Sequence, residues 1–102
     1  MLSFMLSDFD WDEGNRDKNL TKHNVSVEEI EQAFFDDDKK EFTDILHSGV
    51  EVRYRLVGKT KSGRILFIVF TRREDKIRVI SARDINRKEE SLYEKATGAT
   101  KI

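Results

Sequence analysis

The 102-residue sequence contains no cysteine and no proline, and it has only two histidines. Without cysteine the chain cannot form a disulfide framework or a thiolate metal site, and this composition is compatible with a reducing cytoplasm. With only His23 and His47, it offers no paired-histidine metal motif. It also lacks the glycine-rich loop of phosphate-binding enzymes and the nucleophile elbow of serine hydrolases. Most enzyme classes with a local sequence signature are thereby unsupported.

Long hydrophobic runs are missing as well. No apolar stretch reaches the length that spans a bilayer, so no membrane association is expected. The apolar start, residues 1–6, lacks a basic region and a small-residue cleavage site, which makes it a poor signal peptide, and Met5 is an alternative start. At this length we expect one domain, residues 1–102, with a single modest core.

The net charge of −1 conceals an uneven distribution. Residues 1–51 carry 5 Lys and Arg against 14 Asp and Glu, whereas residues 52–102 carry 14 against 6. Two interpretations are open: the basic half binds a polyanion, or the two halves fold together and neutralise each other on a solvated surface. Composition alone favours the second. The isoelectric point near 6.1 also argues against a protein that coats nucleic acid nonspecifically.

The N-terminal part is predicted to contain a short strand and a polar helix. Aromatic and aliphatic residues place the strand over Ser3–Phe9. A pattern at Asp10 that resembles a capping box begins a helix over Trp11–His23, in which Leu20 and the tryptophan at its start are the obvious core residues. The helix should end at Asn24, because asparagine tolerates the left-handed conformation.

A second helix, over Val27–Phe35, has the clearer signals. Ser26 and Glu29 form a capping box. One face carries the apolar residues Val27, Ile30, Ala33 and Phe34. Three aspartates, residues 36–38, then end the helix; a solvated turn is favoured over a divalent-cation site for this run. Residues 41–47 are either a short strand or irregular.

The C-terminal half is predicted to be an antiparallel meander followed by a helix. A strand over Val50–Leu56 alternates between an apolar face (Val50, Val52, Tyr54, Leu56) and a polar face (Glu51, Arg53, Arg55). After a turn at Lys59–Gly63, two further strands follow at Arg64–Thr71 and Lys76–Arg83, joined by a turn at Arg72–Asp75. The first of these two strands is apolar enough to be central and covered on both faces.

Asn86 then caps a helix over Arg87–Ala96, and Gly98 lies just past its end. The predicted order is βααβββα, an α+β domain with helices packed on an antiparallel sheet.

Cations gather at the predicted strand ends. The candidates are Arg53, Arg64, Arg78, Arg83 and Arg87, together with the pair Lys22 and His23 at the end of the first helix. Arginine is the preferred planar ligand for phosphate. Arginines near a histidine suit cleavage of RNA, which needs a base for the ribose 2′-OH, cations for the phosphate and an acid for the leaving 5′ oxygen. This chemistry needs no metal and no cofactor.

Each of these residues also has an ordinary structural explanation. Lys22 and His23 are favourable at a helix C-terminus whatever their chemistry. Arg53 fits the solvent-exposed face of an amphipathic strand, and Arg78 fits a cross-strand ion pair. Tyr93 either stacks on a base or packs in the core. The residues alone leave both interpretations open.

The sequence resembles the BrnT toxins of bacterial type II toxin–antitoxin systems, from Phe9 to about Glu94. No single landmark is decisive, but their order and spacing are specific. The landmarks are Phe9–Asp12, Lys18–Leu20, Lys22–Val25, Asp44 with His47, Arg53 with Gly58, Gly63–Thr71, Ile80–Arg83, Arg87, Glu89 and Tyr93.

The resemblance implies a compact RelE-like fold and an endoribonuclease that attacks cellular RNA, stopping translation and growth. It also implies a cognate ribbon-helix-helix antitoxin, a hetero-oligomer with that antitoxin, and contact with operator DNA through the antitoxin alone. The residues carried over for catalysis are His23, Arg64, Arg83, Lys22 and Arg53, and those for RNA binding are Arg78, Arg87 and Tyr93.

The sequence departs from the family pattern at three positions. Asn24 replaces a common glycine, the aspartate run lacks a following proline, and Val52 stands where an acidic residue often precedes Arg53. Two other functions remain open: a non-catalytic RNA- or protein-binding module that uses the basic half, and a degenerate toxin that keeps only its antitoxin contacts.

Overall fold

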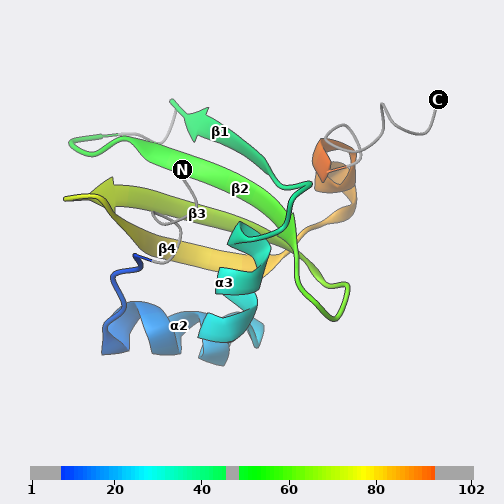
Figure 1. Ribbon diagram of the computed structural model, residues 1–102, viewed down its shortest axis with the longest axis horizontal. Coiled ribbons are helices and arrows are strands. Elements are labelled where there is room, and N and C mark those ends of the chain that lie inside the picture. Colours follow the sequence, from blue (N-terminus) through cyan, green and yellow to red (C-terminus); the bar gives the residue numbers. More distant parts are fainter. Residues whose placement is uncertain (1–7, 46–48, 94–102) are drawn as a thin grey trace.

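The protein is a single four-stranded antiparallel sheet with two helices on one side (Figure 1). The computed structural model describes residues 8–45 and 49–93. The elements, in chain order, are α2 (Glu13–His23), α3 (Val27–Phe34), β1 (Lys40–Asp44), β2 (Arg53–Lys59), β3 (Ile65–Arg73), β4 (Lys76–Asp84) and the 3₁₀ turn η1 (Arg87–Glu89). The spatial order of the strands is β1-β2-β3-β4, so each connection is a simple hairpin. No helix in the described part is long and apolar enough to cross a membrane.

The predicted α+β class is confirmed, but the predicted order of elements is wrong. A strand, β1, follows α3 where the sequence left a strand or irregular structure open. The strand predicted over Ser3–Phe9 lies mostly outside the described residues, and its end forms only an isolated bridge from Phe9 to Ile77. Within the described residues, the order is therefore two helices, four strands and a 3₁₀ turn. The last predicted helix begins as η1 and continues as α-helix to residue 93, where the described part ends.

Helix α2 begins at a different cap from the predicted one. Asp12, not Asp10, accepts a hydrogen bond from the Asn15 backbone N–H, and the Asn15 side chain accepts one from the Asp12 N–H. The Asp10 N–H instead donates to the carbonyl of Ile77 at 2.8 Å, so Asp10 belongs to the chain segment beside β4. The predicted end is confirmed: Asn24 is left-handed, with φ of 55°.

The face that α2 buries is polar, which the sequence did not predict. Asn15 and Asn19 are buried, whereas Leu20, predicted as a core residue, is 50% exposed. The Asn19 amide accepts from the Ala82 N–H at 2.9 Å and donates to the Asn15 carbonyl at 3.1 Å. Lys18 Nζ donates to the Ile80 carbonyl at 3.2 Å. Helix α2 therefore supplies hydrogen-bonding partners to the outer edge of β4, where a strand would otherwise leave backbone groups unpaired.

Helix α3 follows its sequence signals. The Ser26 and Glu29 capping box is present, and Ile30, Ala33 and Phe34 are buried against the sheet. These three residues belong to the main core cluster, which also includes Leu66, Ile68 and Phe70 of β3. The predicted turn at the aspartate run is also confirmed, because the Lys39 N–H donates to the Asp36 carbonyl at 3.2 Å.

Strand β3 is central and covered on both faces, as predicted. Leu66 and Ile68 face the α3 side, whereas Phe67 packs in a second cluster with Val57 and Tyr93 on the opposite face. The hairpin turn is shorter than predicted. Only Glu74 and Asp75 have positive φ, at 50° and 69°, so the arginines before them continue β3.

The predicted start of the strand at Val50 is wrong. Strand β2 begins at Arg53, opposite the last residue of β1, Asp44. Val50 and Val52 are 106% and 49% exposed. The sequence alternation continues upstream of Arg53, but β1 no longer extends alongside it, so the apolar side chains there are not covered.

At Gly58 the sheet lies close to the backbone of α3. A Cβ at this position would lie 2.3 Å from the Ala33 carbonyl oxygen. Gly58→Ala is therefore expected to destabilise the protein by about 3 kcal/mol, since helix and strand must separate. Urea unfolding measures this loss of stability. The matched control is Gly49→Ala, where a Cβ would have no neighbour within 4 Å. Equal stability of the two variants would contradict this account of the packing.

Candidate active site

The predicted site cations divide between the two faces of the sheet. Because side chains alternate along a strand, the neighbours Arg83 and Asp84 at the end of β4 point in opposite directions. Asp84 is paired with Arg64 on the α3 side. Arg83 lies on the other face, opposite Phe67 in the β3–β4 register. Arg64 and Arg83, both carried over as catalytic residues, are therefore separated by the sheet.

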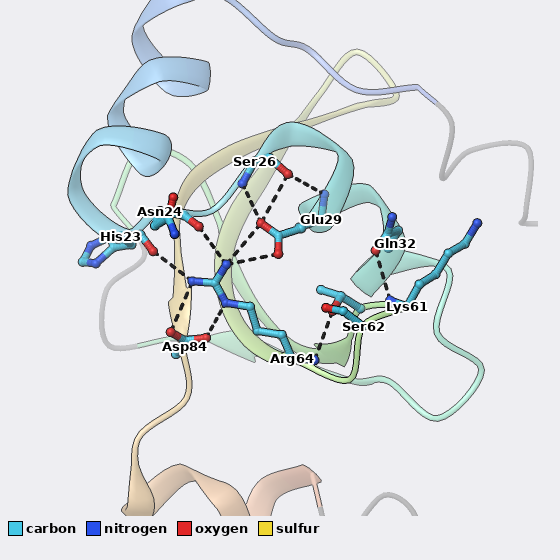
Figure 2. A network of polar contacts seen from close by, with 10 residues as sticks. His23, Asn24, Ser26, Glu29, Gln32, Lys61, Ser62, Arg64 and Asp84 are labelled. Atoms are coloured by element: carbon cyan, nitrogen blue, oxygen red, sulfur yellow. Dashed lines mark hydrogen bonds and ion pairs between the residues drawn. The ribbon is translucent and has the colours of Figure 1, made fainter.

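On the α3 side, Arg64 joins three segments (Figure 2). Its Nε and Nη2 donate to the two Asp84 carboxylate oxygens at 2.6 and 3.2 Å. Its Nη1 donates to the Asn24 carbonyl at 2.7 Å and to both Glu29 carboxylate oxygens at 3.1 Å. Its Nη2 also donates to the His23 carbonyl at 2.9 Å. Arg64 thus ties the α2–α3 junction to the end of β4.

All five N–H groups of the Arg64 guanidinium are used in this cluster. The hydrogen bond to Arg64 lowers the pKa of Asp84, whereas the pKa of Glu29 is lowered first by the Ser26 backbone N–H and then by Arg64. The Asp84 hydrogen bond is the main cause that raises the pKa of Arg64. The role of Arg64 as a phosphate ligand stays a prediction, and its contacts favour a clamp that holds the fold together.

Lys22 and His23 lie at the end of α2, beside this clamp. Both are exposed, and the His23 carbonyl is an acceptor for Arg64. Neither residue lines the cleft described below, so the structure does not bring the predicted proton-transfer group to Arg83.

The three predicted RNA-binding residues lie in three separate places. Arg78 Nη2 donates to Asp12 Oδ2 at 2.7 Å, close to the start of α2. Arg87 is exposed on η1. Tyr93 is buried, at 7% exposure, and its hydroxyl donates to Asp36 at 2.7 Å. Burial and this carboxylate raise the pKa of the Tyr93 hydroxyl. The packing explanation fits Tyr93 better than base stacking does.

The opposite face of the sheet carries a cleft of about 360 Å³, whose lining is rich in arginine. It is formed by Asp44, Arg53, Arg55, Phe67, Val69, Ile80, Ser81, Arg83 and Glu89. Residues of β2, β3 and β4 meet here because Arg55, Val69 and Ser81 are aligned across the three strands. Of the predicted catalytic residues, the structure thus brings together Arg53 and Arg83.

Arg83 and Glu89 form a bidentate ion pair in the cleft. Two parallel hydrogen bonds, of 2.8 and 2.7 Å, join the Arg83 guanidinium to the Glu89 carboxylate. The guanidinium carbon also lies 4.6 Å from the centre of the Phe67 ring. Hydrogen bonding to Arg83 lowers the pKa of Glu89 despite its burial, and Glu89 in turn raises the pKa of Arg83. Glu89 is therefore a carboxylate at neutral pH.

A β-bulge shapes the floor of the cleft. The β3–β4 register shifts between Val69 and Phe70, which leaves Ile80 as the extra residue of β4. Ile80 and Ser81 consequently both line the cleft, although they are consecutive. Bulges re-aim side chains next to active sites. The sequence gives no signal for this irregularity.

Sequence reasoning missed Arg55 and Glu89 as cleft residues. The alternation along β2 places Arg55 on the same face as Arg53, which was the available signal. Glu89 was named only as a family landmark, and the structure pairs it with Arg83. Within residues 8–45 and 49–93, no group of three His, Cys, Asp or Glu residues could hold a metal ion.

The fold resembles a solved structure. The crystal structure of the Brucella abortus ribonuclease toxin BrnT matches with a TM-score of 0.57 and 22% identity, covering 78% of this chain and 96% of that chain. At this identity the similarity is evidence for the fold alone. A comparison with curated proteins gives no match.

The sequence itself matches one protein family over residues 11–89. That family is described as the ribonuclease toxin, BrnT, of type II toxin–antitoxin systems. The match covers most of the chain and confirms the resemblance predicted from its landmarks. Membership implies ribonuclease activity and an antitoxin partner. With its four-stranded sheet and arginine-rich cleft, this chain belongs to the BrnT family of ribonuclease toxins.

Proposed function

We propose that this protein is a metal-independent endoribonuclease whose active site is the cleft on the open face of the sheet. The observation that carries the proposal is the meeting of Arg53, Arg55 and Arg83 with the Glu89 carboxylate in one cleft. Such a site can neutralise a phosphodiester without a metal, since arginine binds phosphate oxygens through paired N–H donors.

In this mechanism, the ribose 2′ oxygen attacks the adjacent phosphorus, and the bond to the 5′ oxygen breaks. Glu89 accepts the 2′-OH proton, because two hydrogen bonds from Arg83 hold its carboxylate in the cleft. Arg53 and Arg83 offset the negative charge that develops on the phosphate. In this mechanism, water supplies the proton to the leaving 5′ oxygen, and the described residues that line the cleft include no histidine. The products are a 2′,3′-cyclic phosphate and a 5′-hydroxyl end.

The alternative in which His23 transfers protons beside Arg64 has weaker support. Every Arg64 donor is already occupied by protein acceptors. A phosphate there would have to displace Asp84, Glu29 or the backbone carbonyls that join α2 to α3. Lys22 and His23 also lie away from the cleft. We therefore assign the chemistry to the cleft and a stabilising role to Arg64.

Family membership supports the cellular part of the proposal. RNA cleavage would stop translation and growth in the cytoplasm, and a ribbon-helix-helix antitoxin would neutralise the toxin. Toxin and antitoxin would form a hetero-oligomer that contacts operator DNA through the antitoxin. A compact RelE-like architecture, with its sheet face as the RNA site, belongs to the same proposal.

The purified chain is expected to cleave a single-stranded oligoribonucleotide equally well with and without EDTA. The same oligonucleotide with 2′-deoxyribose at the cleavage point should be resistant, because the nucleophile is missing. Product ends identified by mass spectrometry should carry the cyclic phosphate. Loss of cleavage in EDTA would contradict metal independence. RNA binding without cleavage at every protein concentration would favour the non-catalytic binding module.

A further inference from the structure

Arg55 is the one cleft arginine whose observed contacts leave a buried N–H without a hydrogen-bonding partner. Its Nε is buried and unpaired within the part of the chain that the structure describes. The nearest carboxylate oxygen, Asp44 Oδ2, is 3.9 Å from this atom, which is too long for a hydrogen bond. A buried, charged donor without an acceptor is costly, so natural sites rarely retain one without a reason.

The guanidinium of Arg55 is nevertheless held in place. Its central carbon lies 5.4 Å from the centre of the Phe42 ring and 6.0 Å from that of Phe67. Phe67 is the same ring over which Arg83 is stacked, at 4.6 Å. The two guanidiniums therefore converge on one aromatic side chain, and the positive charge of Arg55 also contributes to lowering the pKa of Glu89. Arg55 thus contacts two rings, while its Nε has no hydrogen-bonding partner among the described residues.

Three other arginines differ from Arg55 in their hydrogen bonding. Arg64 uses every N–H, and Arg83 is bonded in parallel to Glu89. Arg72 is also stacked on two rings, those of Tyr54 and Phe70, but it donates to Glu41 at 3.0 Å. A guanidinium that is stacked on rings and lines the cleft without a hydrogen-bonded carboxylate of its own suits an anion of tetrahedral shape.

We propose that Arg55 is a phosphate-binding residue of the active site, whose guanidinium donates to the non-bridging oxygens of the RNA phosphate held in the cleft. This inference rests on the proposed function, because it takes RNA as the ligand. It makes Arg55 the first contact of the phosphate, with Arg83 shared between that phosphate and Glu89. The Arg55 side chain is 37% exposed although its Nε is buried, so the phosphate is bound by the part of the guanidinium that faces the cleft.

The test compares Arg55→Gln with Arg72→Gln, which remove equal charge from ring-stacked arginines of neighbouring strands. The probe is an oligoribonucleotide with 2′-deoxyribose at the cleavage point, which binds but cannot react. We expect Arg55→Gln to weaken binding about tenfold and to reduce the slope of log K against log salt by about 0.7, the value of one phosphate contact on a single strand. Cleavage of the all-ribose oligonucleotide should fall about a hundredfold. Arg72→Gln should change neither.

The outcomes separate this inference from the proposed function. If the wild type binds the probe but cleaves no RNA, the nuclease assignment fails, and a reduced salt slope for Arg55→Gln still supports phosphate binding. If the wild type cleaves RNA and Arg55→Gln matches it in rate and salt slope, Arg55 is not a phosphate ligand. Equal losses in both variants, accompanied by equal falls in thermal midpoint, would also overturn the inference. If the wild type neither binds nor cleaves RNA, both proposals fail.

Discussion

Arg83→Ala is expected to lower the rate of RNA cleavage about a thousandfold while leaving the fold intact. The guanidinium would oppose the charge that develops on the phosphate and hold Glu89 in position for the 2′-OH proton. Its contribution to stability is smaller, because its side chain is 36% exposed and its ion-pair partner lies in the adjacent η1 turn. Single-turnover cleavage and the thermal midpoint, measured on the same sample, report the two quantities separately.

The control for this prediction is Arg73→Ala. Arg73 also lies in the sheet and forms a 2.5 Å ion pair, with Glu51, but it does not line the cleft. Its removal should leave the cleavage rate within about twofold of the wild type, because Arg73 lies outside the cleft and an exposed ion pair contributes little to stability. A wild-type rate for Arg83→Ala, or an equal loss for Arg73→Ala, would place the chemistry outside the cleft.

Arg64→Ala is expected to have the largest effect on stability among the arginine variants, about 4 kcal/mol. It removes charge-assisted bonds to two backbone carbonyls and two carboxylates that connect three segments of the chain. The truncated side chain leaves the carbonyls at the α2–α3 junction without their donor. Denaturant unfolding measures the loss, with Arg73→Ala expected to lose less than about 1 kcal/mol. Arg64→Ala with wild-type stability and no cleavage would instead restore Arg64 to the active site.

The same clamp has a pH dependence of known sign. The pKa values of Asp84 and Glu29 are lowered from their ordinary values of 3.8 and 4.5. A lowered folded-state pKa means that the stabilisation is present above the ordinary pKa and is lost as the pH falls through the folded-state value. The wild type should therefore lose stability more steeply than Arg64→Ala on acidification below about pH 4.5.

Local signals in the sequence predicted most of the elements, because each signal depends on neighbouring residues. The Ser26–Glu29 box, the left-handed Asn24 and the central apolar strand were all correctly recognised. The error at Leu20 has a physical origin. Hydrophobic periodicity assumes that a buried helix face is apolar, but α2 packs on a strand edge that needs donors and acceptors, so Asn15 and Asn19 are buried instead.

The site was harder to predict, because a phosphate-binding arginine and a structural arginine look alike in a sequence. Arg64 and Arg83 both stand at strand ends, yet alternation places them on opposite faces. Which N–H groups remain available depends on partners far along the chain, such as Asp84 for Arg64. Arg55 is distinguished by a buried Nε that has no hydrogen-bonding partner among the described residues, and a sequence pattern cannot show this.

The hydrogen bonds between α2 and the outer edge of β4 also affect how copies of this protein can associate. The outer edge of β4 is occupied along its length: Ile77 bonds to the segment around Phe9, and Asn15, Lys18 and Asn19 bond to its later residues. Sheets polymerise laterally when both edges accept another strand. Among the described residues, β4 is closed and edge-to-edge pairing is left to β1, where two copies related by a twofold axis would cover each other's edge. Pairing through the described edges therefore ends at two copies instead of extending into a fibre.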